Sequence, residues 1–338
     1  MKILFLSHQW TNNSHLSLYS GMKRIVHFAA ETNDVTLVTW GTGDKEHMEG
    51  NVHVITVKGS GKDYLFLKRM AISRKGAAIA KDFDAVHSIV SDCTYYLPDH
   101  GFTMTLHVLP GVVHYKELKQ NIFLFMKYHI IQKRAFRRAK EIACVSTNLV
   151  DGIPAKYRGK ARFIPHGIDT DFWNPALAKP HPGFSEGGYI LCVGAHGLDK
   201  DLLAQFIQAN PALPFVFVGI KEKLDDFPNA HYLTKVSDED LRDLYFGCAL
   251  MFRPLRFATA NNSLLEALSM GKTVLASRIP GVTDYLSDDT CVFIDTLKDR
   301  SLPDMTTLRL DPTFLRQTAL QKFGWRKVLD TYISLYNR

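Results

Sequence analysis

Four polar residues, Asn261, Asn262, Ser263 and Glu266, stand where the segment "RFATANNSLLEALSMGKTVLASRIPG" changes from polar to apolar. This change predicts a helix that begins at Asn262 or Ser263 and ends at a turn at Gly271. A serine followed three residues later by a glutamate is typical of a capping box. A helix N-terminus also offers free N–H groups and partial positive charge, which suit a phosphate. Several N–H groups are free at such an end, so the two interpretations are compatible.

Two further residues that could take part in chemistry, a lysine and a histidine, lie at the ends of predicted elements. Lys200 begins a second predicted helix, where a cation is unfavourable for the helix dipole and an anionic ligand would explain it. His107 ends the apolar run "FTMTLHV". A histidine there fits either a packed core residue or a catalytic group at a strand end, and the residues alone leave both open.

Short apolar runs alternate with helical patterns along the whole chain, which predicts βαβ units and an α/β fold with parallel sheets. A Pro- and Gly-rich stretch interrupts the series, so we expect two tandem Rossmann-like, doubly wound domains that face one cleft. The expected organisation is an N-terminal domain at 1–165, a linker at 166–187, a C-terminal domain at 188–320, and a helix at 321–338 that packs back on the first domain.

The composition is that of a globular protein, with 46% hydrophobic and 22% charged residues. The chain has no apolar run of 18 residues and starts with no signal-like segment, so we expect neither a membrane-spanning helix nor secretion. Its five cysteines are far apart and show no metal-ligand spacing. This pattern favours a reducing cytoplasm and predicts no metal site and no disulfide framework.

Positive charge is concentrated in the first half. Residues 1–165 contain 23 Lys and Arg against 13 Asp and Glu, whereas the overall net charge is only +7. Residues 116–140 combine many basic side chains with apolar ones, which fits a surface helix with a buried face or an element that lies on anionic lipid. No recognised nucleic-acid-binding motif is present, so we expect no nucleic-acid partner.

Five segments then share a family resemblance. In order, they are "FIPHGIDTDFWNP", "ILCVGAHGLDKD", "VSDEDLRDLYFGCALMFRP", "NNSLLEALSMGKTVLASRIPG" and "FGWRKVLDTYISLY". They resemble the hallmarks of GT-B glycosyltransferases of the retaining group 1 (GT4-like) family. The resemblance implies that the C-terminal domain binds a nucleotide-sugar, that the N-terminal domain binds the acceptor, and that no metal is needed.

The resemblance also implies roles for individual residues. Glu266 matches a glutamate that holds the ribose hydroxyls, Lys200 a lysine that neutralises the diphosphate, and His107 a histidine near the transferred sugar. Asn262 and Ser263 match the helix end that faces the diphosphate. The further expected nucleotide-binding residues are Asn261, His196 and Gly194, and the expected donor-sugar or acceptor residues are Gly21, Ser20, Arg256, Ala258 and His166.

The sequence departs from the family pattern at four positions. Ala258 stands where a first glutamate is usual, Ala195 where an arginine is usual, Ser20 where a glycine is usual and His166 where an asparagine is common. An acidic donor sugar would be repelled by a glutamate at position 258, and Arg253, Arg256 or His196 could then supply a cation. The alternative is a donor site that has lost activity.

We therefore expect a metal-independent glycosyltransferase, a hexosyl- or uronosyl-transferase. It would transfer a sugar from a nucleotide-sugar to a hydroxyl of a glycan or glycolipid, with retention of the anomeric configuration. If the donor sugar is acidic, the transferred group is a uronate. No cofactor is expected, and a UDP-sugar is the expected donor. Polysaccharide biosynthesis and a location in the cytoplasm, peripheral on the inner face of the cell membrane, fit the basic N-terminal half. The alternatives are an inactive nucleotide-sugar-binding protein or partner subunit, and an epimerase, for which no extra carboxylate is evident.

Overall fold

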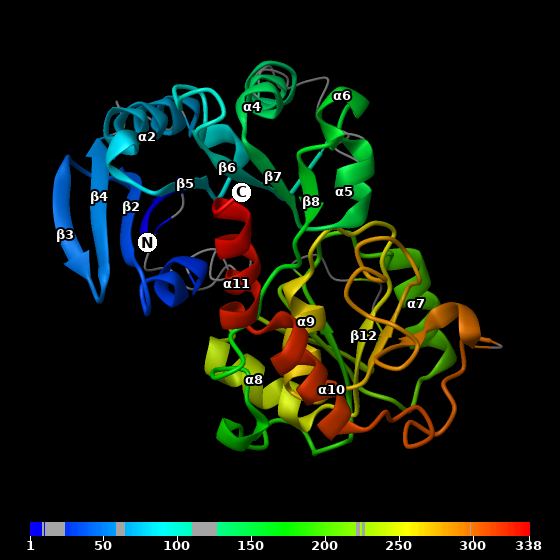
Figure 1. Ribbon diagram of the computed structural model, residues 1–338. Coiled ribbons are helices and arrows are strands. Elements are labelled where there is room, and N and C mark those ends of the chain that lie inside the picture. The colour runs from blue at the N-terminus through cyan, green and yellow to red at the C-terminus, as the bar shows by residue number, and fades with distance from the viewer. Residues whose placement is uncertain are drawn as a thin grey trace. The chain divides into compact units, whose positions relative to one another are not determined.

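The computed structural model describes residues 1–8, 10, 24–58, 65–109, 127–220, 224, 227–297 and 299–338. They form two compact units. Unit 1 comprises Met1–Pro165 with Trp325–Arg338, and unit 2 comprises His166–Gly324. Each unit has a largely parallel sheet with helices on both faces, so the predicted doubly wound α/β class is confirmed (Figure 1).

The sheet of unit 1 has eight strands in the order β3-β4-β2-β1-β5-β6-β7-β8. Its strands are β1 (Lys2–Leu6), β2 (Asp34–Gly41), β3 (Lys45–Glu49), β4 (Val52–Lys58), β5 (Ala85–Ser88), β6 (Thr103–Leu106), β7 (Glu141–Cys144) and β8 (Ala161–Phe163). All neighbours are parallel except β3 and β4. Sequence patterns did not predict β3, because this edge strand is mostly exposed and has no apolar alternation.

The central strand β1 is buried on both faces, as parallel strands are. Ile3 and Phe5 pack into a core with the C-terminal helix α11 (Trp325–Tyr336) and with residues 24–29. Leu6 points to the opposite face, where a Cβ added to Gly76 of α2 (Leu65–Ile79) would lie 2.4 Å from its Cδ2 atom. The missing side chain therefore lets α2 approach the sheet closely.

The remaining helical segments of unit 1 are η1 (Ala80–Asp82), η2 (Ser91–Cys93), η3 (Lys127–Gln132), α4 (Lys133–Arg138), α5 (Thr147–Gly152) and α6 (Ala155–Arg158). The basic helix expected over 116–140 lies partly outside the described residues, and its described part is η3 followed by α4. Ala135 and Phe136 of α4 are buried. Among the described residues, no helix combines the length and the apolar character needed to cross a bilayer.

Helix α11 is tied to the sheet of unit 1 through a buried histidine. His87 of β5 has Nδ1 2.6 Å from the Tyr336 hydroxyl and Nε2 2.8 Å from Thr105 Oγ1, and the Tyr332 hydroxyl lies 3.2 Å from the same Thr105 oxygen. Burial, and to a lesser extent the nearby His107, lower the pKa of His87 to about 3. The imidazole is therefore neutral at physiological pH and acts as a polar link inside an apolar core.

The sheet of unit 2 has six parallel strands in the order β11-β10-β9-β12-β13-β14. Its elements are η4 (Pro175–Leu177), β9 (Ile190–Val193), α7 (Lys200–Ala209), β10 (Phe215–Val218), β11 (Ala230–Leu233), α8 (Asp238–Gly247), β12 (Leu250–Arg253), α9 (Asn262–Ser269), β13 (Val274–Ala276), β14 (Val292–Phe293), η5 (Ile294–Thr296), α10 (Pro312–Thr318) and η6 (Ala319–Phe323). Helix α7 covers one face and α8 to α10 cover the other.

The stretch 166–187, expected as a linker, instead packs into unit 2. Ile168 and Trp173 are buried in its core, and Ile168 N donates to Phe323 O at 2.8 Å. Ser269 Oγ and Arg316 Nη1 both donate to the Trp173 carbonyl, at 2.7 and 3.0 Å. Its lack of periodicity reflects irregular backbone whose polar groups are satisfied by such hydrogen bonds.

The neutral state of His87 predicts a pH dependence of stability. Its folded pKa lies below its unfolded value, so the unfolded state takes up more protons between pH 6.5 and 3, and the contribution of this residue is lost as pH falls through that window. Between pH 7 and pH 5 the wild type should lose about 2 kcal/mol relative to His87→Gln. Urea unfolding of both proteins at the two pH values measures this, and an unchanged difference would contradict the assignment.

Candidate functional site

The strand order of unit 2 reverses beside β9. The chain runs from β9 outward to β10 and β11, then crosses to the other side of β9 to form β12. Ligands of doubly wound sheets bind beyond the carboxyl ends of the two strands at such a reversal. The loops at 194–199 and 254–261 follow these two strands and therefore define the candidate site.

Two glycines shape the first loop. Gly194 and Gly197 have φ values of +80° and +70°, a region that side-chain-bearing residues rarely adopt. A Cβ on Gly197 would lie 2.3 Å from the carbonyl oxygen of Phe257 in the second loop. The close approach continues in hydrogen bonds, since Arg256 N donates to Gly197 O at 2.9 Å and Asp199 N donates to Pro254 O at 3.0 Å.

Arg253, the last residue of β12, is hydrogen-bonded to the backbone of the first loop. Its side chain is buried, and it donates to the carbonyl oxygens of Gly194 and, at 2.8 Å, His196. Burial lowers its pKa to about 10, so the guanidinium stays charged at neutral pH. No carboxylate among the described residues forms an ion pair with it, and its Nε has no hydrogen-bond partner there. A buried cation in such surroundings favours an anionic ligand.

Arg256 is placed differently from Arg253. It is exposed and forms ion pairs with Asp199, at 3.2 Å, and with Asp201, both at the start of α7. Its charge is thus shared with two carboxylates. Three residues were predicted as substitute cations: Arg253, Arg256 and His196. Arg256 is paired with carboxylates and the pKa of His196 is lowered, so Arg253 is the buried permanent cation among them.

The N-terminus of α9 is capped by Asn261 and not by Ser263, which corrects the predicted capping box. The Asn261 side chain accepts from Ser263 N at 3.1 Å and from Ser263 Oγ at 2.6 Å. Glu266 does not reach back to the helix start, because its carboxylate points into the core. An asparagine side chain caps a helix as well as a serine does, and here it stands two residues before the predicted cap.

Glu266 is buried and accepts a 2.9 Å hydrogen bond at Oε2 from the Tyr245 hydroxyl. Burial raises its pKa to about 7; the Tyr245 hydrogen bond acts in the opposite direction and the Asp238 charge in the same one. A carboxyl group with such a pKa is partly ionised at neutral pH. It gains its charge most readily where a ligand donates further hydrogen bonds to it.

The other predicted residues of unit 2 lie around these loops. Lys200 is the exposed first residue of α7, and His196 packs its ring against Phe257 at 5.3 Å between centroids. Desolvation of that ring, and then the Arg253 charge, lower the His196 pKa. Ala258 is buried. His166 is buried and donates its backbone N–H to the Tyr285 hydroxyl at 2.9 Å.

His107 belongs to unit 1, where it follows β6. It is half-buried, and its Nε2 lies 3.0 Å from the carbonyl oxygen of Ile89. The predicted residues Gly21 and Ser20 lie outside the described residues. Sequence reasoning passed over a further group in unit 1, His8 with Asp92 and Arg69, although His8 and Asp92 each follow a predicted strand closely.

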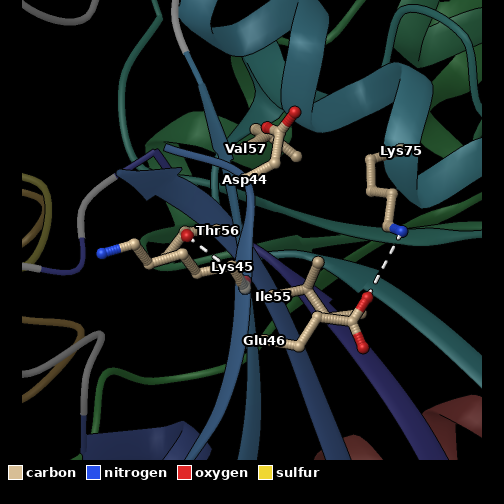
Figure 2. Close-up of a pocket in the computed structure, with 7 residues that line it drawn as sticks. All are labelled: Asp44, Lys45, Glu46, Ile55, Thr56, Val57 and Lys75. Atoms are coloured by element: carbon tan, nitrogen blue, oxygen red, sulfur yellow. Dashed lines mark hydrogen bonds and ion pairs between the residues drawn. The ribbon is translucent and has the colours of Figure 1, made fainter. Parts of the chain in front are cut away.

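A pocket of about 300 Å³ lies elsewhere in unit 1, at the outer edge of the sheet. Figure 2 shows Glu46 and Lys75 on its wall lying toward one another, 3.6 Å apart. Asp44 accepts from Lys58 N and Thr56 Oγ1 donates to Gly43 O. Asp44, Glu46, Thr56 and Lys75 thus already have partners, and the pocket lies at β3 and β4 rather than at the central strands of the sheet.

Comparisons with known structures identify the fold that these two units form. The sucrose-phosphate synthase of Thermosynechococcus elongatus superposes with a TM-score of 0.75 at 15% identity, covering 99% of this chain and 98% of that one. The catalytic domain of starch synthase IV from Arabidopsis thaliana, bound to ADP and acarbose, superposes with a TM-score of 0.70 at 13% identity, covering 100% of this chain and 98% of that one. Anabaena HepE in complex with UDP and glucose superposes with a TM-score of 0.68 at 12% identity, covering 100% of this chain and 99% of that one. The fold is therefore GT-B.

Residues 189–301 match the family model of glycosyl transferases group 1. The chain therefore carries a group 1 glycosyltransferase domain in unit 2, and the predicted resemblance is confirmed. Among curated proteins, none matches the sequence. The matched range contains both loops, Arg253 and the whole of α9, so the domain and the candidate site coincide.

The raised pKa of Glu266 predicts a second pH dependence. The folded state holds a proton that the unfolded state releases, so stability present below pH 4.5 is lost as pH rises to 7. Glu266→Gln removes this titration. Between pH 5.5 and pH 8 the wild type should lose about 2 kcal/mol relative to the variant, measured by urea unfolding. Parallel stability curves over this range would show that the carboxyl is ionised throughout.

Proposed function

We propose that this protein is a glycosyltransferase that moves a sugar from a nucleotide diphosphate-sugar to a hydroxyl of a glycan or glycolipid acceptor. Retention of the anomeric configuration and independence from a metal and from any cofactor belong to the proposal. The group 1 domain in unit 2 supports the reaction class. The reaction breaks the bond between the sugar and the diphosphate, so the site must stabilise growing negative charge on the leaving group.

The placement of the Arg253 side chain is the main support for this proposal. A buried guanidinium beneath a glycine loop, with no carboxylate partner among the described residues, suits the diphosphate. The N-terminus of α9 starts beyond the same strand and adds N–H groups and partial positive charge. The sequence lacks the arginine usual at position 195, and Arg253 places a cation beside the same loop from the neighbouring strand.

The remaining roles follow from chemistry and position. Glu266 would hold the ribose hydroxyls, because a carboxylate accepts two hydrogen bonds from a diol. Lys200, Asn261, Asn262 and Ser263 would contact the diphosphate, and His107 the reacting sugar. A UDP-sugar is the proposed donor, in keeping with HepE, whose structure contains UDP. The absence of a glutamate at 258 suits an acidic sugar, because no carboxylate from that position would repel it.

The acceptor is proposed to bind unit 1, which carries the net positive charge of the chain. A lipid-linked acceptor on an anionic membrane would explain that charge, so we propose a cytoplasmic protein, peripheral on the inner membrane face, that acts in polysaccharide biosynthesis. The rival is an inactive nucleotide-sugar-binding subunit, which Ala195 and Ala258 favour. A product with a new glycosidic linkage separates the two.

The diphosphate role of Arg253 can be tested by binding. We expect one of UDP, GDP, dTDP or ADP to raise the melting temperature of the wild type, since a ligand of the native state stabilises it. In Arg253→Met the Kd of that nucleoside diphosphate should rise about 10- to 100-fold, which corresponds to the loss of one charge-assisted hydrogen-bonding group. The Kd of the corresponding nucleoside, which has no phosphate, should hardly change. Arg253→Lys keeps the charge and checks folding.

The matched control is Arg256→Met, since Arg256 is already paired with two aspartates and should change the Kd less than threefold, or about 0.7 kcal/mol. Equal losses in the two variants would contradict the assignment. No stabilisation by any nucleotide would favour the inactive rival.

The ribose role of Glu266 predicts a dependence on the ligand's hydroxyls. Wild type should bind the selected nucleotide about tenfold more tightly than its 2′,3′-dideoxy form, because the buried carboxylate would otherwise lack those donors. In Glu266→Gln this preference should shrink to about twofold, since a neutral amide accepts more weakly. Isothermal titration of both proteins with both ligands measures it. A preference that survives the substitution would place the ribose elsewhere.

A further inference from the structure

Unit 1 also contains a reversal of strand order, beside β1. The chain runs from β1 to β2, β3 and β4 on one side, then crosses to form β5 on the other side of β1. The two strands are paired in register, and Ile89 N donates to Leu6 O at 3.0 Å just beyond them. By the rule that located the candidate site in unit 2, a ligand is expected beyond the carboxyl ends of β1 and β5.

Three polar side chains converge at this reversal. His8 follows β1, Asp92 lies in η2 just after β5, and Arg69 comes from α2. Arg69 Nη1 lies 3.0 Å from Asp92 Oδ2, Arg69 Nη2 lies 3.3 Å from His8 Nε2, and His8 Nδ1 lies 3.7 Å from Asp92 Oδ1. The side chains of His8 and Asp92 are only 5% and 2% exposed.

The contacts determine how the imidazole is used. Arginine can only donate, so Nε2 of His8 is the accepting nitrogen, and the proton sits on Nδ1, which faces the Asp92 carboxylate. Cys93 brings a third potential metal-ligand atom, and its Sγ, the imidazole and the carboxylate have such atoms within 4.8 Å of one another. A positive charge from Arg69 already occupies this place, which disfavours a metal ion there. The group therefore holds a hydrogen-bond acceptor, Nε2 of His8, beside the Arg69–Asp92 ion pair.

We propose that His8, Asp92 and Arg69 bind the hydroxyl-bearing acceptor, and that the reacting hydroxyl donates to Nε2 of His8 in place of the long Arg69 contact. This inference rests on the proposed transferase function and adds the acceptor group to it. His8 touches the substrate and orients the hydroxyl oxygen. Asp92 is a positioning residue that fixes the tautomer, and Arg69 holds the charge of Asp92 in balance.

Position in the fold separates this inference from a purely structural ion pair. Other ion pairs of unit 1, such as Arg326 with Glu31 and Lys75 with Glu46, lie on the exposed surface. The His8 group is buried at the edge of the sheet where doubly wound folds bind ligands. A structural pair would affect folding and every partial reaction alike, whereas an acceptor group affects only steps that involve the acceptor.

The test compares His8→Gln and Asp92→Asn with wild type and with His53→Gln, a partly exposed histidine of the same unit. Three quantities are measured: the Kd of the nucleotide, hydrolysis of the donor by water, and transfer to the octyl glycosides of glucose, galactose, mannose and N-acetylglucosamine. We expect His8→Gln to lower kcat/KM for transfer about 100-fold and leave nucleotide Kd and donor hydrolysis within about twofold. Asp92→Asn should lower kcat/KM for transfer about tenfold, because the tautomer is no longer fixed.

A second readout does not depend on turnover. In protein labelled with ¹⁵N-histidine, the active octyl glycoside should shift the Nε2 resonance of His8 and not that of His53. Equal losses of transfer and hydrolysis in His8→Gln, or unchanged transfer, would overturn the proposal. So would the case in which none of the four glycosides is used or moves the His8 signal. If wild type neither binds a nucleotide nor hydrolyses a donor, the proposed transferase function itself fails, which is a distinguishable result.

Discussion

A buried charge, the guanidinium of Arg253, organises the candidate site of unit 2. Taking a guanidinium out of water costs several kcal/mol, and Arg253 recovers part of this by donating to two loop carbonyls. Those bonds fix the backbone of the glycine loop, whose left-handed residues need a rigid frame. The positive charge of Arg253 that no described carboxylate compensates lies beside the N-terminus of α9. The same charge therefore orders the loop and prepares the place for an anion.

The two units repeat one arrangement with different chemistry. In each, strand order reverses beside the unit's first strand, and the residues just beyond that strand and its later neighbour converge. Unit 2 brings a buried cation and two glycines with positive φ to this place, which suits phosphates. Unit 1 brings a histidine between an arginine and an aspartate, which is close to neutral overall and suits a hydroxyl. The fold supplies the position, and the residues at the strand ends supply the specificity.

Much of this architecture could be predicted from apolar periodicity, because fully buried strands and amphipathic helices leave clear patterns. What the pattern could not supply was pairing across distance. Ser263 was predicted as the cap, but the backbone places Asn261 there, and Glu266 contacts Tyr245 because α8 and α9 pack together. Residues 166–187 look like a linker in the sequence, because they are held by separate hydrogen bonds and not by a periodic pattern. These are a backbone bond to Phe323 and side-chain bonds from Ser269 and Arg316. Arg253 and Asp92 depend on strand order, which no local segment encodes.

The two buried titratable groups show how a structural role differs from a binding role. His87 has both ring nitrogens within hydrogen-bonding distance of hydroxyls, so its neutral form is fully satisfied and nothing further is needed to keep it so. Among the residues that the structure describes, Glu266 accepts from one hydroxyl, and its pKa lies near neutrality because burial outweighs that bond. Additional donors from a ribose would favour the carboxylate form, so ligand binding there is coupled to proton release. The pKa of Glu266 lies close to neutral pH, so a ligand can change the charge of this group. The pKa of His87 lies far below neutral pH, so His87 stays neutral and serves the fold.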